Sequence, residues 1–375
     1  MRLLVGHVLD GLRKLPDDGV TCVVTSPPYW SQRAYGCPPV VFGGDHACPH
    51  AWEDLAYALQ PHGDDGWNGQ LGGGKATQAS TRTGTIRSQR CSRCGAWLGE
   101  LGSEPTPGEY VTHLAEVFAE VRRVLHPAGT LWLNLGSTYA GSGKGYAREQ
   151  GERRLRVPYH GKLGRRADEF LPPSFNVVGY KPKDMIPLAW LVGLELQRRG
   201  WWLRGDIVWH RENQMPNSQK DRPVTAHELV LLLTKSRQYF YDYQGSMQPA
   251  LTQEKRALRS VWSIPTRPGP VKHCAPFPEE LVERCLQAGT PGSICATCGQ
   301  PWRRRQEAWV PDCRCDAAGH SPLVLDPFAG SATVLLVAAR MGCDGIGIEL
   351  NPDYAEAAWR RLAAAGEAPA ALEYL

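Results

Sequence analysis

The sequence contains no long apolar segment and no large excess of charge. None of its apolar runs approaches the roughly 20 residues that span a bilayer, and its N-terminus lacks the apolar core and cleavage site of a signal peptide. We therefore expect a cytoplasmic protein without membrane contact. The net charge of +4 allows a polyanionic partner but does not require one, so charge alone excludes no class of substrate.

Patterns that bind nucleotide phosphates are also missing. The glycine-rich segment at 141–145 does not have the spacing of a phosphate loop, and the turn at 326–333 has neither a Gly-Lys-Ser/Thr ending nor a three-glycine fingerprint. Disulfides are not expected, because the twelve cysteines of a cytosolic chain are more typical of metal ligands or free thiols.

The chain does show alternating strand and helix patterns over most of its 375 residues. Strands are expected at 3–5, 20–24, 130–135, 201–210, 229–234, 323–325 and 345–348, and helices at 8–15, 110–125, 185–197, 279–288, 331–341 and 353–364. This alternation predicts an α/β fold with one doubly wound, mainly parallel sheet.

Irregular segments divide this predicted domain. We assign residues 1–35, 109–289 and 321–375 to the catalytic domain, and 36–108 and 290–320 to two cysteine-bearing insertions. Within the domain we expect a basic loop at 141–180 and a target-recognition region at 211–270. Structureless segments of this length are uncommon in compact domains unless they are functional or held by metals.

One stretch, Thr25-Ser26-Pro27-Pro28-Tyr29-Trp30, directly follows the apolar run at 20–24. Proline lacks an N–H, so the strand must end in a stiff turn whose carbonyls are free to accept hydrogen bonds from a ligand. Acceptors beside an aromatic ring suit a flat molecule with an exocyclic amino group. The alternative is a simple strand-ending turn with two core aromatics.

A second motif lies near the other end of the chain, where the strand at 323–325 runs into Asp326-Pro327-Phe328-Ala329-Gly330-Ser331-Ala332-Thr333. Ligands of open α/β sheets bind at such strand ends, and an acid there suits a positively charged ligand. Glu349 ends the next strand 23 residues later, in the usual position of an acid that holds ribose hydroxyls. The alternative is an ordinary strand-turn-helix unit with exposed acids.

Together, the Thr-Ser-Pro-Pro-Tyr and Asp-Pro-Phe-x-Gly-Ser-x-Thr motifs resemble those of the β group of amino DNA methyltransferases, which use S-adenosylmethionine and have a Rossmann-like methyltransferase fold. The resemblance implies a catalytic turn formed by Ser26, Pro27, Pro28 and Tyr29. It implies cofactor contacts from Asp326, Phe328, Gly330, Ser331, Thr333, Glu349 and Phe277. Two positions depart from the pattern: Ala332 replaces a glycine, and His7 stands where an acid often follows glycine.

The resemblance also implies direct methyl transfer to a base that is flipped out of double-stranded DNA and stacked on Tyr29. Ser26 at the first position of the turn favours the exocyclic N4 of cytosine, and a cognate restriction endonuclease is a possible partner. Alternatives are an N6-adenine DNA methyltransferase, an RNA or protein methyltransferase, and an inactive nucleic-acid-binding protein. Cys22 is interpreted as a core residue of the strand rather than a nucleophile.

Eight residues in the insertions have the spacing of zinc ligands. They are Cys295, Cys298, Cys313 and Cys315 in one set and Cys48, His50, Cys91 and Cys94 in the other. His46 or Cys37 could replace His50, and the alternative to both sites is free thiols in loops. We expect two structural zinc ions. Arg303, Arg304, Arg305 and the basic residues at 144–166 could contact DNA phosphates or simply be solvated.

Overall fold

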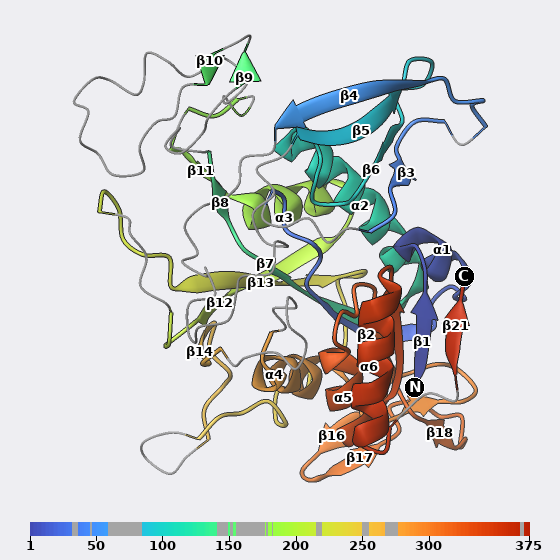
Figure 1. Cartoon of the computed structure of the whole chain (residues 1–375). Coiled ribbons are helices and arrows are strands. Elements are labelled where there is room, and N and C mark those ends of the chain that lie inside the picture. The colour runs from blue at the N-terminus through green and yellow to red at the C-terminus, as the bar shows by residue number, and fades with distance from the viewer. Residues whose placement is uncertain are drawn as a thin grey trace.

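The structure is a computed structural model of the chain (Figure 1). It describes residues 1–31, 37–45, 47–58, 85–140, 149–150, 153–154, 177, 179–181, 183–214, 220–249, 255–266, 277–367 and 371–375. Most of the predicted basic loop at 141–180 lies outside these ranges, as does His46. None of the described helices is long and apolar enough to cross a membrane.

A nine-stranded sheet forms the centre of the molecule, with the order β14–β12–β13–β7–β2–β19–β20–β1–β21. The bounds are β1 (Arg2–Val5), β2 (Val20–Thr25), β7 (Leu125–Leu135), β12 (Trp202–His210), β13 (His227–Thr234), β14 (Val261–Ser263), β19 (Leu323–Asp326), β20 (Asp344–Glu349) and β21 (Leu372–Tyr374). Only β13 runs against its neighbours in this described sheet. The predicted mainly parallel α/β fold is confirmed.

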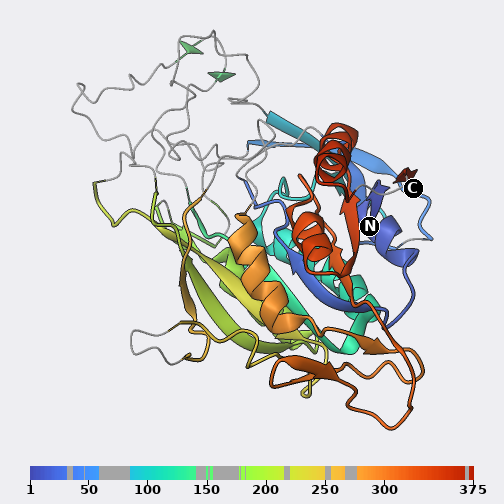
Figure 2. The ribbon, with the colours of Figure 1, turned by 90° about the horizontal axis from the view of Figure 1, so that it is seen from below.

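Helices cover both faces of this sheet (Figures 1 and 2). One layer contains α1 (Val8–Arg13), α2 (Pro107–Val124) and α3 (Leu188–Arg198), and the other contains α4 (Glu279–Gly289), α5 (Thr333–Arg340) and α6 (Pro352–Ala364). Side chains of a strand alternate between the faces. In β7, Leu131 and Leu133 therefore join the first core and Trp132 joins the second.

Two predicted helices begin later than expected. The segment at 185–186 forms β11 (Met185–Ile186), which pairs with β8 (Thr138–Tyr139), and α3 starts only after Pro187. In the cofactor motif α5 starts at Thr333, because Ala332 has a left-handed backbone (φ 57°) that a helix cannot contain. The turn before α5 is therefore longer than the sequence pattern predicts.

The two cysteine-bearing insertions form small sheets of their own. The first contains β3 (Val40–Phe42), β4 (Trp52–Ala58), β5 (Thr85–Cys91) and β6 (Trp97–Gly99), in the order β3–β6–β5–β4. The second contains β15 (Ile294–Cys295) paired with β18 (Gly319–His320), and β16 (Arg303–Arg305) paired with β17 (Ala308–Val310). The short strands β9 (Glu149–Gln150) and β10 (Arg153–Arg154) also pair.

The predicted target-recognition region at 211–270 contributes strands to the large sheet. Strands β13 and β14 of the large sheet both lie within it. The assignment of target recognition to 211–270 stays a prediction.

Candidate active site and metal clusters

The two sequence motifs meet at the carboxyl ends of adjacent strands. β2 and β19 pair in parallel, and the Thr25 hydroxyl at the end of β2 donates a 2.7 Å hydrogen bond to Oδ1 of Asp326 at the end of β19. The two residues are 301 positions apart in the chain. From β19 the chain continues to β20 on one side, whereas β2 has β7 on its other side. Ligands of open α/β sheets bind at such a switch point.

The predicted catalytic turn, residues 26–29, follows β2, and its Tyr29 side chain points toward β7 and β13. Its hydroxyl lies 2.8 Å from Glu228 Oε2 on β13 and 3.0 Å from Asn134 Oδ1 on β7, and Ser26 Oγ donates to it at 3.3 Å. A Cβ on Gly136 would come within 2.9 Å of the tyrosine ring. The ring position therefore requires a glycine there.

The residues around Tyr29 anchor the turn to the first core. Pro27 is buried, and the Pro28 carbonyl accepts a 2.9 Å hydrogen bond from the Tyr110 hydroxyl of α2. Trp30 is buried, and its indole N–H donates to the Glu104 carbonyl at 2.9 Å. Of the two interpretations of the aromatics, core packing therefore holds for Trp30.

Cys22 lies in the core beneath the turn. It is fully buried in β2, and burial raises the pKa of its thiol to about 11. The thiol therefore stays protonated near neutral pH, as befits a structural side chain.

The predicted cofactor acids are both buried at strand ends. Burial raises the pKa of Asp326 to about 7, although the Thr25 hydroxyl and the Phe328 N–H both donate to its Oδ1. Burial also raises the pKa of Glu349, whose oxygens accept 2.8 Å hydrogen bonds from the Gly330 and Asn351 N–H groups. Two desolvated carboxyl groups at adjacent strand ends would suit a ligand with positive charge and hydroxyl groups.

The turn between the acids is held by a residue with no sequence signal. Arg361 on α6 donates to the Ser331 carbonyl at 3.0 Å and to the Thr333 hydroxyl at 2.9 Å, and it pairs with Glu279 at 2.8 Å. The side chains of Ser331 and Thr333 are buried. Nothing in the local pattern at Arg361 could have indicated this contact, because the arginine follows the motif by about thirty residues.

The two predicted aromatic contacts lie on opposite faces of the sheet. Phe328 packs against the first core, and Phe277, just before α4, packs against the second. His7 follows β1 and contacts the edge of the Phe42 ring, with 5.3 Å between the ring centroids. Burial lowers the pKa of His7, so it is neutral near pH 7.

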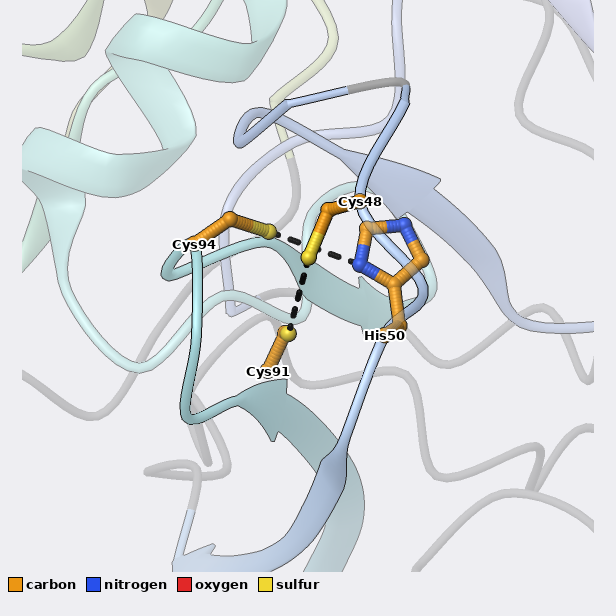
Figure 3. Close-up of side chains that lie close together, drawn as sticks. All are labelled: Cys48, His50, Cys91 and Cys94. Carbon is orange, nitrogen blue, oxygen red and sulfur yellow. Dashed lines mark hydrogen bonds between the residues drawn. The ribbon is translucent and has the colours of Figure 1, made fainter.

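The first predicted metal set converges in the structure (Figure 3). The Sγ atoms of Cys48 and Cys91 are 3.9 Å apart, and Cys94 Sγ is 3.4 Å from His50 Nδ1. All four ligand atoms lie within 4.8 Å of one another. Tetrahedral zinc with sulfur ligands at about 2.3 Å places those sulfurs about 3.8 Å apart. The residues therefore fit zinc, and Cys37 is not among them.

The second predicted set converges as well. Cys295, Cys298, Cys313 and Cys315 also bring their sulfurs within 4.8 Å of one another. Hydrogen bonds from the Cys298 and Thr297 N–H groups lower the pKa of Cys295 to about 6. Amide groups that stabilise a thiolate are typical of zinc knuckles, so this set also fits zinc.

Two of the three consecutive arginines at 303–305 in the second insertion form ion pairs within the protein. Arg304 bonds to Asp242 at 2.7 Å and stacks on Trp309, and Arg303 bonds to Asp312 at 2.7 Å. Ion pairs within the protein therefore account for Arg303 and Arg304 without a contact to DNA.

The sequence of the chain matches a known protein family over most of its length. A model of the N6/N4 methyltransferase family, described as DNA methylase, matches residues 20–360. The chain belongs to this family. Among curated members, it is 34% identical to the type II methyltransferase M.XycI of Xanthomonas campestris pv. cyanopsidis, over 96% of this chain and 87% of that protein. It is 32% identical to the type II methyltransferase M.Cfr9I of Citrobacter freundii, over the same shares.

A solved DNA methyltransferase structure shares the fold. The PvuII DNA methyltransferase (cytosine-N4-specific) superposes with a TM-score of 0.51 at 16% identity, over 95% of this chain and 84% of that chain. At this identity the likeness supports the methyltransferase fold alone.

Proposed function

We propose that this DNA methylase transfers a methyl group from S-adenosylmethionine to the exocyclic N4 of cytosine in double-stranded DNA. The observation that carries the proposal is the hydrogen bond between Thr25 and Asp326. It joins the Ser-Pro-Pro-Tyr turn to a buried acid at the next strand end, so a base and a cofactor bound to the two motifs would be neighbours.

The buried acids suit the cofactor. When bound, S-adenosylmethionine supplies an activated methyl group on a positively charged sulfur. Asp326 would face its charged methionine part, which favours the ionised carboxylate, and Glu349 would bind the ribose hydroxyls. The backbone at Gly330, with a φ of 50°, allows a close approach that a side chain would hinder.

The turn would hold and align the base. Ser26 Oγ and the Pro27 carbonyl would accept hydrogen bonds from the amino group and aim its nitrogen at the methyl carbon. The ring of Tyr29 would stack on the flipped base. The preference for cytosine rests on Ser26, since the adenine enzymes of this family more often carry an acid or amide at that position.

We further propose that each cysteine cluster binds one structural zinc ion, since the ligand atoms have tetrahedral spacing. The curated relatives are named as type II methyltransferases, so a cognate restriction endonuclease is the partner we infer. Target recognition is assigned to the region at 211–270, which includes the segments that connect strands of the sheet.

The test is transfer of labelled methyl from S-adenosylmethionine to double-stranded DNA of mixed sequence, followed by nucleoside analysis. We expect N4-methylcytosine, and a loss of about 100-fold in Ser26→Ala, whose amino-group acceptor is gone. Ser321→Ala, at an exposed position outside the site, is the matched control. N6-methyladenine would overturn the base preference, and absence of label in DNA would overturn the substrate.

A further inference from the structure

A chain of hydrogen bonds connects the catalytic turn to a carboxylate on β13. Ser26 Oγ donates to the Tyr29 hydroxyl at 3.3 Å, and that hydroxyl donates to Glu228 Oε2 at 2.8 Å. The other oxygen of Glu228 accepts a 3.1 Å hydrogen bond from Arg211. Two segments that lie 199 positions apart in the sequence thus form one path from the serine to an acid.

The path is largely shielded from water. The side chains of Glu228 and Arg211 are 15% and 21% exposed. Asn134 Nδ2 donates to the same Glu228 oxygen at 3.2 Å and to the Leu229 carbonyl at 3.2 Å, which fixes the carboxylate against β7 and β13. Among the described residues, Tyr29 and Arg211 are the titratable or charged groups that bond to Glu228.

Tyr29 keeps its proton in this environment. Burial, together with the nearby Glu228 carboxylate, raises the pKa of Tyr29 well above its ordinary value. A neutral tyrosine can accept a hydrogen bond from Ser26 while it donates one to Glu228. The two hydroxyls can therefore pass a proton along the path without either being ionised beforehand.

The chemistry requires such a path. Methylation of an amino group forms a nitrogen–carbon bond and breaks the carbon–sulfur bond, whose electron pair stays on sulfur. The amino nitrogen must then lose one of its protons. The turn contains no carboxylate of its own to accept it, because its first position is Ser26.

We propose that Glu228 takes up this proton through Ser26 and Tyr29. The amino proton moves to Ser26 Oγ, the Ser26 proton moves to Tyr29 Oη, and the Tyr29 proton moves to Glu228 Oε2, which becomes a neutral acid and later releases the proton to solvent. Glu228 does not touch the base, so it acts as a positioning and proton-accepting residue. This inference rests on the proposed methyl transfer to an amino group.

The test compares wild-type protein with Glu228→Gln and Tyr29→Phe in single-turnover transfer of labelled methyl to double-stranded DNA. Glutamine keeps the shape and a hydrogen-bond acceptor for Tyr29 but cannot take up a proton. Phenylalanine keeps the ring but breaks the path. Glu373→Gln is the matched control, because Glu373 also pairs with an arginine, Arg2, on the far edge of the sheet.

We expect both path variants to lose at least about tenfold in single-turnover rate, with S-adenosylmethionine binding, measured by calorimetry, unchanged. Glu228→Gln should also show a smaller solvent deuterium effect than wild type, because its side chain cannot take up the proton. Glu373→Gln should behave as wild type.

Two results would overturn the inference. A Glu228→Gln variant with the wild-type rate and solvent deuterium effect would show that the proton leaves by another route, while methyl transfer by the wild type would still stand. Loss of cofactor binding in parallel with the rate would show a structural role. If wild-type protein labels no amino group in DNA, the proposed function itself fails, and this outcome is seen before any variant is compared.

Discussion

The two ends of the parallel strands, here called the carboxyl edge and the amino edge of the sheet, differ in how well their polar groups are paired with oppositely charged or hydrogen-bonding partners. At the carboxyl edge, Asp326 and Glu349 are buried with raised pKa values, and Ala332 has a left-handed backbone. At the amino edge, Lys235 donates to the Leu125 carbonyl at 2.9 Å and pairs with Asp18. Uncompensated charge and strained backbone lower stability and are typical of ligand sites. The comparison supports assigning binding to the carboxyl edge and stability to the amino edge.

The two cysteine clusters follow the same division. A series of side-chain contacts connects the first insertion to the catalytic turn. Trp97 of β6 stacks on His113, which bonds to Glu104 at 3.3 Å. Glu104 in turn accepts from Trp30, and the Gly102 carbonyl accepts from the N–H of residue 31 at 2.7 Å. The loop at 100–104, which follows β6 of the first insertion, therefore holds the catalytic turn in place.

The second cluster lies where β19 begins, at the opposite edge. Its insertion is fixed by Arg304 to Asp242 and by the contact of Trp309 with Phe240, whose ring centroids are 6.1 Å apart. A Cβ on Gly292 would come within 2.4 Å of the Trp309 ring, so the packing is tight. This cluster adjoins the start of β19, and we expect it to support the sheet rather than the turn.

The largest expected effect comes from removing a candidate ligand of the first cluster, which tests whether this cluster supports the catalytic turn. In Cys91→Ala we expect bound zinc to fall from two ions to one and the methyl-transfer rate to fall by about 100-fold, because a small displacement of the turn misaligns the base. Zinc analysis and single-turnover rates measure both. A rate near that of the wild type, with one zinc lost, would show that the turn does not depend on this cluster.

The same change in the second cluster should act on stability. In Cys298→Ala we expect the loss of one zinc ion and a fall of about 5 °C in Tm, while the transfer rate stays within about twofold of wild type. Calorimetry and the transfer assay, both below the new Tm, measure these effects. An equal loss of activity in both variants would remove the difference between the two clusters.

Replacing the buried Asp326 by asparagine tests whether the carboxyl edge gives up stability for ligand binding. The pKa of Asp326 is about 7 in the folded chain and about 4 when unfolded, so the folded state binds the proton more tightly and loses stability as pH rises from about 4 to about 7. We expect Asp326→Asn to raise Tm by about 3 °C at pH 8, to leave it unchanged near pH 4, and to abolish cofactor binding.

Calorimetry across this pH range and titration with S-adenosylmethionine test the change at Asp326. An unchanged pH dependence of Tm in the variant would show that the carboxyl is not destabilising.

The smallest effect concerns the left-handed turn residue. Ala332→Gly should raise the free energy of unfolding by about 1 kcal/mol, because glycine adopts positive φ without the steric cost of a Cβ. The control is Ala357→Gly in the middle of α6, where glycine should lower it by about 1 kcal/mol. Denaturant unfolding measures both, and changes of the same sign would refute the strain at Ala332.

Much of the fold was predictable because its signals are local. The apolar runs of β2, β7 and β13 and the helical stripe of α2 are periodic over single segments, and the structure has strands and a helix there. Both cysteine sets could be grouped because most ligands are close in sequence. The start of α5 was predicted too early, since the left-handed backbone of Ala332 arises from the turn and not from its residue type.

The candidate site was predictable only in its motifs. Ser26, Asp326 and Glu349 stand in recognisable patterns, but the sequence assigned no partner to any of them. The bond from Thr25 to Asp326 spans 301 positions, and that from Tyr29 to Glu228 spans 199. Which distant residues meet depends on the order of strands in the sheet.

The sequence by itself therefore determined the class of fold, the two motifs and the two sets of candidate metal ligands, because each is encoded in short-range periodicity or spacing. Only the tertiary structure decided that Glu228 bonds to Tyr29 and that Arg361 bonds to Ser331 and Thr333. It also decided that the two clusters lie at opposite edges of the sheet. The physical reason is that strand order minimises the free energy of the whole chain, through burial on both faces of the sheet, and no local segment contains that information.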